Sequence, residues 1–270
     1  APRVNLGRAL MDSGDLVQAR KHFERVLRDQ PSDTGLRAAA LVNRAVCKGR
    51  QGDTEGEIAD LTAVVELEGA PIEPLAAAFL NRAATRLRLG DTGDAIADYT
   101  AVVELNDARP ELVAMALDNR AISRERQGDT EGAIADYTAV VGSKGATGEQ
   151  AAWALIKRGV YTFLRGDIEP AIEDLSAVLE VRDPPRELVA RALVCRGAGH
   201  AKLGDIRSSM DDWLAAIRER ECDEGIRVHG LRLAFFVVCL DQDDDLLERV
   251  SRSAAEGLSH LDVAEHFGQL

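Results

Sequence analysis

Four asparagines recur at one fixed interval in the first half of the chain. They are Asn5, Asn43, Asn81 and Asn119, and the interval in the numbering is always 38. A carboxamide offers a hydrogen-bond acceptor and two donors, so an asparagine can pair with a peptide backbone without reading its sequence. The same column continues as Lys157 and Cys195. This pattern predicts a row of side chains that binds an extended polypeptide.

Three arginines stand two helical turns after these asparagines, along the same predicted face. They are Arg50, Arg88 and Arg126, and Leu164 and Lys202 take the equivalent places further on. A guanidinium group matches a carboxylate with two parallel hydrogen bonds. We therefore expect a peptide ligand that is rich in acidic groups or that ends in a carboxylate. The alternative interpretation is that the asparagines organise local helix contacts and the arginines are solvated.

An apolar patch follows at helical spacing in the fifth repeat. It consists of Trp153, Ile156, Val160 and Phe163. Such a patch is able to anchor an apolar side chain of the same ligand. Packing against the helix of the preceding repeat accounts for it equally well.

Six glycine-aspartate pairs define the elements that must position these side chains. They are Gly14-Asp15, Gly52-Asp53, Gly90-Asp91, Gly128-Asp129, Gly166-Asp167 and Gly204-Asp205. The pairs follow one another at the same interval as the asparagines, without a slip. A period of this size is typical of a stacked repeat array, in which each unit buries its apolar face against its neighbours.

Each repeat has the pattern of two helices joined by a tight turn. Residues 111–127 contain neither Gly nor Pro and are apolar at helical spacing, and residues 131–141 repeat that spacing. Gly128 can adopt the left-handed conformation that ends a helix, and Asp129 or Thr130 can cap the next one. No alternating strand pattern occurs outside these helices. The sequence therefore predicts an all-α protein.

The repeats resemble the tetratricopeptide repeat family, and their sequences are similar to those of its bacterial members. The resemblance lies in the Gly-Asp turn and in the segments Asn81 to Thr100 and Asn119 to Thr138, both of the form NRA…GD…AIADYT. It also lies in three sets of residues: a small residue within the first helix (Ala45, Ala83, Ala121, Gly159, Gly197), an alanine in the second (Ala19, Ala95, Ala133, Ala171) and a large residue four later (Phe23, Tyr99, Tyr137, Leu175). The resemblance implies a scaffold without enzymatic activity that binds a partner protein or peptide in a concave groove formed by the first helices.

The expected architecture is a right-handed α-solenoid of about seven helix-turn-helix repeats with a degenerate C-terminal capping unit. The repeats fall roughly at 1–33, 34–71, 72–109, 110–147, 148–185, 186–223 and 224–257, the last being the degenerate cap, and 258–270 forms a terminal capping segment. The period exceeds the usual length of about 34 residues by about one helical turn, or ~6 Å. We expect these additional residues to lengthen each first helix. Because Ala1 falls inside a first helix, we expect the chain to be a piece of a longer protein.

Two further columns, one basic and one acidic, have the spacing of structural ion pairs. Arginines at 44, 82, 120, 158 and 196 track aspartates at 60, 98, 136, 174 and 212, at a constant offset of 16 in the numbering. We expect them to join the two helices of a repeat or to join neighbouring repeats. Identical copies spread along an array do not converge on one catalytic centre, so we do not interpret them as an active site.

Phe235 and Phe236 lie in a bulkier apolar helix at the C-terminal end. Repeat arrays need atypical terminal units to cover an exposed apolar face. Capping is therefore the favoured interpretation of this helix, with residues 243–257 as its partner. Docking of a partner protein on the two phenylalanines is the alternative.

Composition limits the remaining function classes. The net charge is −13 and the isoelectric point about 4.9, which disfavours nucleic acid, including an RNA-binding helical array. The sequence has no catalytic constellation, no metal motif and no cofactor fingerprint, and its four cysteines (Cys47, Cys195, Cys222, Cys239) lack metal or disulfide spacing. No apolar run reaches ~20 residues, so we expect a cytoplasmic protein without a membrane span.

The alternative to a scaffold is the sensor or regulatory arm of a larger signalling or effector protein with a separate catalytic domain. The sequence does not indicate an oligomeric state.

Overall fold

The computed structural model describes residues 2–29, 32–219, 223–241, 249–250 and 252. Within these ranges the backbone forms thirteen α-helices and no strand, which confirms the predicted all-α class. The helices belong to two compact units, residues 1–145 and 146–270.

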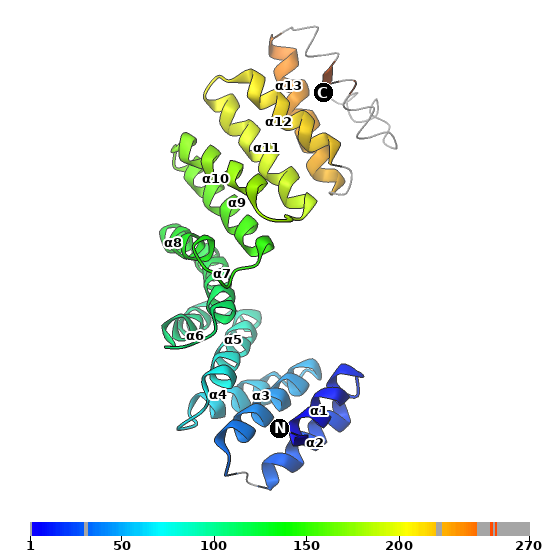
Figure 1. Cartoon of the computed structure of the whole chain (residues 1–270), viewed down its shortest axis with the longest axis vertical. Helices are drawn as coiled ribbons and strands as arrows, with labels where there is room; N and C mark the ends of the chain where they lie inside the picture. The colour runs from blue at the N-terminus through cyan, green and yellow to red at the C-terminus, as the bar shows by residue number, and fades with distance from the viewer. Residues whose placement is uncertain (1, 30–31, 220–222, 242–248, 251, 253–270) are drawn as a thin grey trace. The chain divides into compact units, whose positions relative to one another are not determined.

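The first unit contains four helix hairpins. Its helices are α1 (Pro2–Asp12), α2 (Leu16–Arg28), α3 (Thr34–Arg50), α4 (Thr54–Val65), α5 (Ile72–Leu89), α6 (Thr92–Glu104), α7 (Pro110–Gln127) and α8 (Thr130–Val141). Consecutive helices pack against each other, and each first helix also touches the next first helix, as α3 touches α5. The observed α7 and α8 agree with the helices predicted for residues 111–127 and 131–141 (Figure 1).

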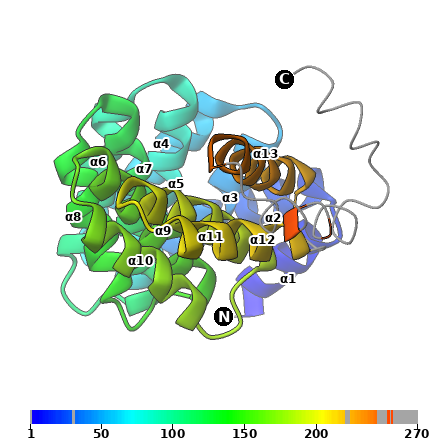
Figure 2. The same ribbon diagram turned by 90° about the horizontal axis from the view of Figure 1, so that it is seen from above.

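The second unit contains two further hairpins and the beginning of a third. Its helices are α9 (Gly148–Leu164), α10 (Ile168–Glu180), α11 (Arg186–Lys202), α12 (Ile206–Arg218) and α13 (Glu224–Asp241). Helices α11, α12 and α13 lie side by side, as Figure 1 and Figure 2 both show. This is the consecutive stacking of an α-solenoid.

The Gly-Asp turn ends one helix and starts the next. All six glycines have φ between 80° and 92°, the left-handed region that side-chain-bearing residues avoid. In the fourth repeat Asp129 then caps α8, because its Oδ1 accepts a hydrogen bond from the Gly132 amide at 2.9 Å. The turn chemistry predicted from the sequence is therefore observed.

The first helices of the repeats are longer than the second helices. Helices α3, α5, α7, α9 and α11 have 17 or 18 residues, whereas α4, α6, α8, α10 and α12 have 12 or 13. The additional residues lie at the start of each first helix, where Ile72 and Pro110 begin α5 and α7. The extended period thus lengthens the first helix, as expected.

Part of the predicted C-terminal cap falls on described residues. Helix α13 provides the first helix of the predicted degenerate unit, but the side chains of Phe235 and Phe236 lie outside the described residues, as does segment 258–270. Of the predicted partner 243–257, residues 249–250 and 252 are described, and Val250 is buried against Trp213. Among the described helices, none is long and apolar enough to cross a membrane.

Candidate functional site

The arginine and aspartate columns form one ion pair inside each of five hairpins. In every case the guanidinium on the first helix binds the carboxylate on the second helix through two hydrogen bonds, at 2.6 or 2.7 Å between nitrogen and oxygen for the ion pair itself. The pairs are Arg44–Asp60, Arg82–Asp98, Arg120–Asp136, Arg158–Asp174 and Arg196–Asp212. The hydrogen bond to the aspartate raises the pKa of Arg44, Arg158 and Arg196. The predicted ion pairs are confirmed, and these five join the two helices of one repeat.

A second cation reaches the same aspartate in several repeats. Arg124 Nη1 lies 2.8 Å from Asp136 Oδ2 and donates to the Gly132 carbonyl at 3.1 Å. Lys48 and Arg86 do the same in their own repeats. This column was not predicted from the sequence, although it recurs at the same interval as the others.

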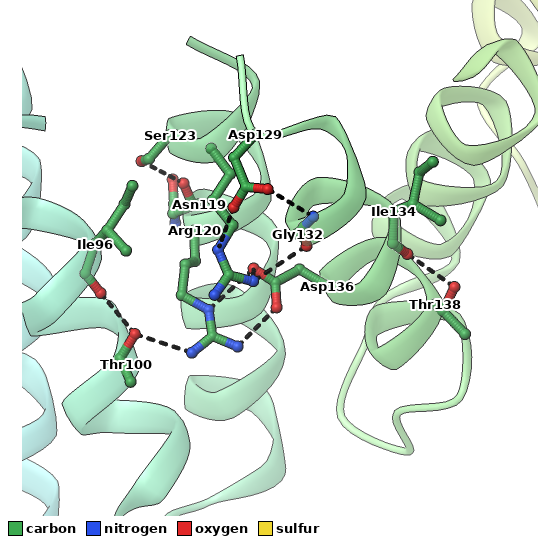
Figure 3. A network of polar contacts seen from close by, with 11 residues as sticks. Ile96, Thr100, Asn119, Arg120, Ser123, Asp129, Gly132, Ile134, Asp136 and Thr138 are labelled. Carbon is green, nitrogen blue, oxygen red and sulfur yellow. Dashed lines mark hydrogen bonds and ion pairs between the residues drawn. The ribbon is translucent and has the colours of Figure 1, made fainter. Parts of the chain in front are cut away.

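The arginine that pairs with the aspartate inside each hairpin also joins neighbouring repeats. Arg120 Nη1 donates to Thr100 Oγ1 at 3.0 Å, and Thr100 in turn donates to the Ile96 carbonyl at 2.8 Å (Figure 3). Equivalent bonds are Arg82 to Thr62 and Arg196 to Ser176. The charged groups of this network are occupied by other parts of the scaffold. The network therefore holds the repeats in register and leaves little for a ligand.

The asparagine column is partly used inside its own helices. Asn43 is buried, and its Nδ2 donates to the Ala39 carbonyl at 2.6 Å. Asn119 makes the same bond to Met115 at 2.8 Å. Each bond uses one of the two amide hydrogens, so a carboxamide oxygen and one hydrogen remain for another partner. Asn81 is half-buried and Asn5 exposed.

The arginine column is not uniform. Arg88 Nη2 lies 2.9 Å from Oε2 of Glu57, a buried carboxylate on α4 of the preceding repeat. Arg50 and Arg126 are exposed. Arg88 therefore has a structural role that the sequence did not predict.

A pocket of about 420 Å³ lies on the first-helix side of the first unit. Asn43 lines it, together with Val42 of the same helix and Leu112 of α7. Arg8 of α1 and Arg109, which precedes α7, supply two cations. The pocket thus combines one asparagine of the asparagine column, an apolar floor and two guanidinium groups. Glu73 is the acidic residue of its lining.

A larger pocket of about 560 Å³ lies in the second unit, between α9, α11 and the start of α13. Three residues of the predicted apolar patch, Trp153, Ile156 and Val160, line it, whereas Phe163 is not among its lining residues. Lys157 and Cys195 also line it, and they occupy the column that holds asparagine in the first four repeats. The same column therefore reaches a pocket in each unit.

Two cations lie over the indole ring of this larger pocket. The distance to the Trp153 ring centroid is 5.9 Å from Lys157 Nζ and 5.6 Å from Arg191 Cζ. Arg191 also donates to Glu187 Oε1 through Nε and Nη2. Burial raises the pKa of Cys195, so that its thiol stays protonated near neutral pH.

Several lining residues could not be predicted from the sequence because they lie outside the periodic columns. Arg8 and Arg109 belong to this group in the first unit, and Asp223 at the end of the sixth repeat and Ile226 and His229 of the degenerate unit belong to it in the second. Their contribution follows from tertiary packing, for which the repeat period gives no signal. Among the described residues, no group of three His, Cys, Asp or Glu side chains is placed to hold a metal ion.

Solved structures with this stacking are tetratricopeptide repeat proteins. The C-terminal part of a TPR repeat-containing protein from Cytophaga hutchinsonii is similar at a TM-score of 0.70 and 13% identity, over 97% of this chain and 98% of that one. Pseudomonas aeruginosa pilF is similar at 0.59 and 12%, over 80% and 90%. YrrB, described as a TPR protein with an unusual peptide-binding site, is similar at 0.57 and 15%, over 78% and 97%.

Sequence comparison agrees with these structures. No curated protein matches this sequence at a significant level. The tetratricopeptide repeat profile, however, matches residues 4–71 and 80–151, together more than half of the chain. With a profile match over more than half of the chain and thirteen described helices that pack as consecutive hairpins within each unit, this protein belongs to the tetratricopeptide repeat family.

Proposed function

We propose that this protein is an interaction module that binds an extended, acidic segment of a partner protein on the first-helix side of its first unit. Members of the tetratricopeptide repeat family generally mediate protein–protein interaction, so the general role follows from the family. We propose in addition that the asparagine column, Asn5, Asn43, Asn81 and Asn119, and the arginines beside it bind the partner segment.

The pocket that contains Asn43 carries the proposal. Its apolar floor suits a side chain of a bound peptide, and the remaining carboxamide groups of Asn43 suit the peptide backbone. Arg8 and Arg109 place two cations at this pocket in a chain of net charge −13. An acidic peptide is repelled by most of the molecule and attracted at this pocket, which favours binding there.

The exposed Arg50 and Arg126 add two further cations to the first unit. Arg88 contributes less to a ligand because Glu57 already engages it. A carboxylate at the end of a peptide and a carboxylate on a side chain present the same group to these arginines. Preference for a terminal carboxylate is therefore the narrower form of the proposal.

A display library of capped twelve-residue peptides tests this function. We expect the intact protein to enrich sequences with Asp and Glu, and we expect an Arg8→Gln, Arg109→Gln variant to lose that enrichment. For a selected peptide, each substitution should weaken binding about fivefold, as loss of a partly exposed charge pair does. Asn43→Ala should weaken the binding of acidic and neutral peptides equally.

Arg25→Gln is the matched control, since Arg25 is exposed on α2 and does not line the pocket. Circular dichroism must show that all variants are folded. Equal enrichment of acidic peptides by the double variant and by the intact protein would contradict the proposed site. A library without any enriched peptide would contradict peptide binding itself.

A further inference from the structure

We propose that this protein associates with a second copy of itself, through a basic face on α2 of one copy and an acidic face on α10 of the other. The basic face consists of Lys21 and Arg28 with Arg25 at its edge, and the acidic face consists of Glu169, Glu173 and Glu180. None of these residues lines either of the two pockets described above. The inference therefore goes beyond the proposed function and does not depend on it.

The basic face lies on the side of α2 that is turned away from the core of the first unit. The residues that α2 buries are Ala19, Phe23 and Val26. Lys21, Arg25 and Arg28 follow one another at i, i+4 and i+7 on the outer side, and all three are exposed. They form no ion pair with another described residue, whereas Arg20 of the same helix binds Glu24 at 3.1 Å. The basic face is therefore accessible to a partner.

The acidic face of α10 occupies the same positions of the repeat. Glu173 and Glu180 stand four repeats after Lys21 and Arg28, and they lie opposite the buried residues of α10. They are exposed, as is Glu169, and within the described part of the chain they have no cationic partner. Seven residues, or ~10.5 Å of helix, separate the two charges in each face. Two helices side by side can therefore form both ion pairs at once, in parallel or antiparallel orientation.

The charges of whole repeats are complementary in the same way. Residues 1–33 contain six Lys or Arg and five Asp or Glu, whereas residues 148–185 contain four and seven. The first repeat is thus positive in a chain of net charge −13. Two such chains repel each other overall, but the first repeat of one attracts the fifth repeat of the other. Because the chain itself carries the complement of its basic face, we assign that face to a second copy.

Each copy carries both faces. The contact is therefore either made twice in a symmetric dimer or repeated from copy to copy in a longer assembly. Exposed ion pairs contribute little individually and are screened by salt. We expect weak association, with a Kd of about 0.1–1 mM at low salt.

Sedimentation equilibrium of the intact chain measures this association. In about 50 mM KCl the weight-average mass should rise with protein concentration up to about 0.5 mM. In about 0.5 M KCl it should return to the mass of one chain, 29.1 kDa. An intact chain of 29.1 kDa at every concentration in low salt would overturn the proposal.

Two charge-swap variants identify the faces. Lys21→Glu, Arg28→Glu makes both faces acidic, and Glu173→Lys, Glu180→Arg makes both basic. Each new residue already occupies the equivalent position of the other helix, so the fold accommodates it. Each variant alone should associate at least about tenfold more weakly than the intact chain. An equimolar mixture should associate again, because each variant then meets faces of opposite charge, and a damaged fold does not produce that recovery.

Arg37→Glu, Lys144→Glu is the matched control. Both residues are exposed in the first unit and lie outside α2, and the change in net charge equals that of the α2 variant. Association of the control should stay within about threefold of the intact chain. A control as weak as the α2 variant, or a mixture of the swap variants that does not associate, would overturn the proposal.

Phosphatidylserine vesicles test an anionic membrane as the competing occupant. We expect the intact chain not to sediment with these vesicles at the same low salt, since its net charge opposes general attraction to anionic lipid. Sedimentation that is lost in Lys21→Glu, Arg28→Glu would assign the basic face of α2 to a membrane and contradict self-association.

Discussion

Arg88 shows that one member of a periodic column can take a structural role while its equivalents stay exposed. Its partner Glu57 stands where four other repeats have alanine, at positions 19, 95, 133 and 171. Gly49 makes room for that carboxylate, because a Cβ at residue 49 would lie 2.4 Å from Glu57 Cδ. The three residues form one local adaptation of the second repeat to a buried charge.

Removal of Arg88 should therefore destabilise the protein through Glu57. A buried carboxylate that loses its cation is strongly unfavourable, although the 61% exposure of the Arg88 side chain lets water replace part of the interaction. We expect Arg88→Ala to lower the free energy of unfolding by about 1–2 kcal/mol in urea denaturation. In a Glu57→Ala background the same change should have an effect below about 0.5 kcal/mol.

Arg126→Ala is the matched control for this cycle. Arg126 occupies the equivalent position, and Ala95 stands where its acidic partner would be. Its replacement should change stability by less than about 0.5 kcal/mol. If Arg88→Ala were equally harmful with and without Glu57, the ion pair would not be the reason for the loss.

Residues that repeat could be predicted from the sequence, and residues that depart from the repeat could not. The Arg–Asp pairs follow from two columns that keep a constant offset from each other, so their contact required no structure. The Glu57–Arg88 pair depends on a substitution present in one repeat only. Its partner could not be identified by periodicity, because neighbouring repeats carry alanine at that place.

At the scale of helices, the hairpins are held by small residues of the first helix opposite large residues of the second. Gly197 of α11 faces Trp213 of α12, the largest of the fully buried side chains. A Cβ at residue 197 would lie 2.5 Å from Trp213 Nε1. Trp213 has little freedom to move, since it is buried and bonded to the Val194 carbonyl. The smallest residue of the column thus accommodates the largest partner.

Gly197→Ala should destabilise the α11–α12 hairpin. Overpacking a core contact costs about 1–3 kcal/mol, and the better helix propensity of alanine offsets about 0.5–1 kcal/mol of that. We expect a net loss of about 1–2 kcal/mol in thermal or urea unfolding. Gly159→Ala is the control in the same column, because its Cβ would meet Leu175 and neighbouring atoms at 3.2–3.3 Å.

The control should be close to neutral, because its contacts with the Ala171 carbonyl and Leu175 need shifts of only a few tenths of an ångström, which the better helix propensity of alanine offsets. A Gly159→Ala variant that loses as much stability as Gly197→Ala would show that the column tolerates no Cβ, independent of the partner.

Helix positions, turns and hairpin pairing were predictable at this scale. The pockets were not, because their rims use Arg8, Arg109 and the start of α13, which lie outside the repeated pattern.

For the whole molecule, the distribution of charge matters more than its sum. The chain has 46 acidic and 33 basic residues, and the sequence disfavours general attraction to polyanions. Net charge could not indicate that each pocket has two Lys or Arg residues and one acidic residue in its lining. That local excess of positive charge depends on which side chains the fold brings together.

Salt should therefore affect folding and acidic-peptide binding in opposite directions. The net charge of −13 opposes compaction, and this long-range repulsion is screened when KCl rises from about 0.05 to 0.3 M. The buried Arg–Asp pairs are screened much less. We expect the free energy of unfolding to rise by about 0.5–1 kcal/mol while affinity for an acidic peptide selected from the display library falls several-fold. Urea denaturation and anisotropy titration at matched salt measure the two quantities. The same peptide with each Asp and Glu replaced by Asn and Gln lacks the charges, so its affinity should depend little on salt. If stability fell with salt instead, exposed ion pairs rather than net repulsion would dominate the electrostatics of this scaffold.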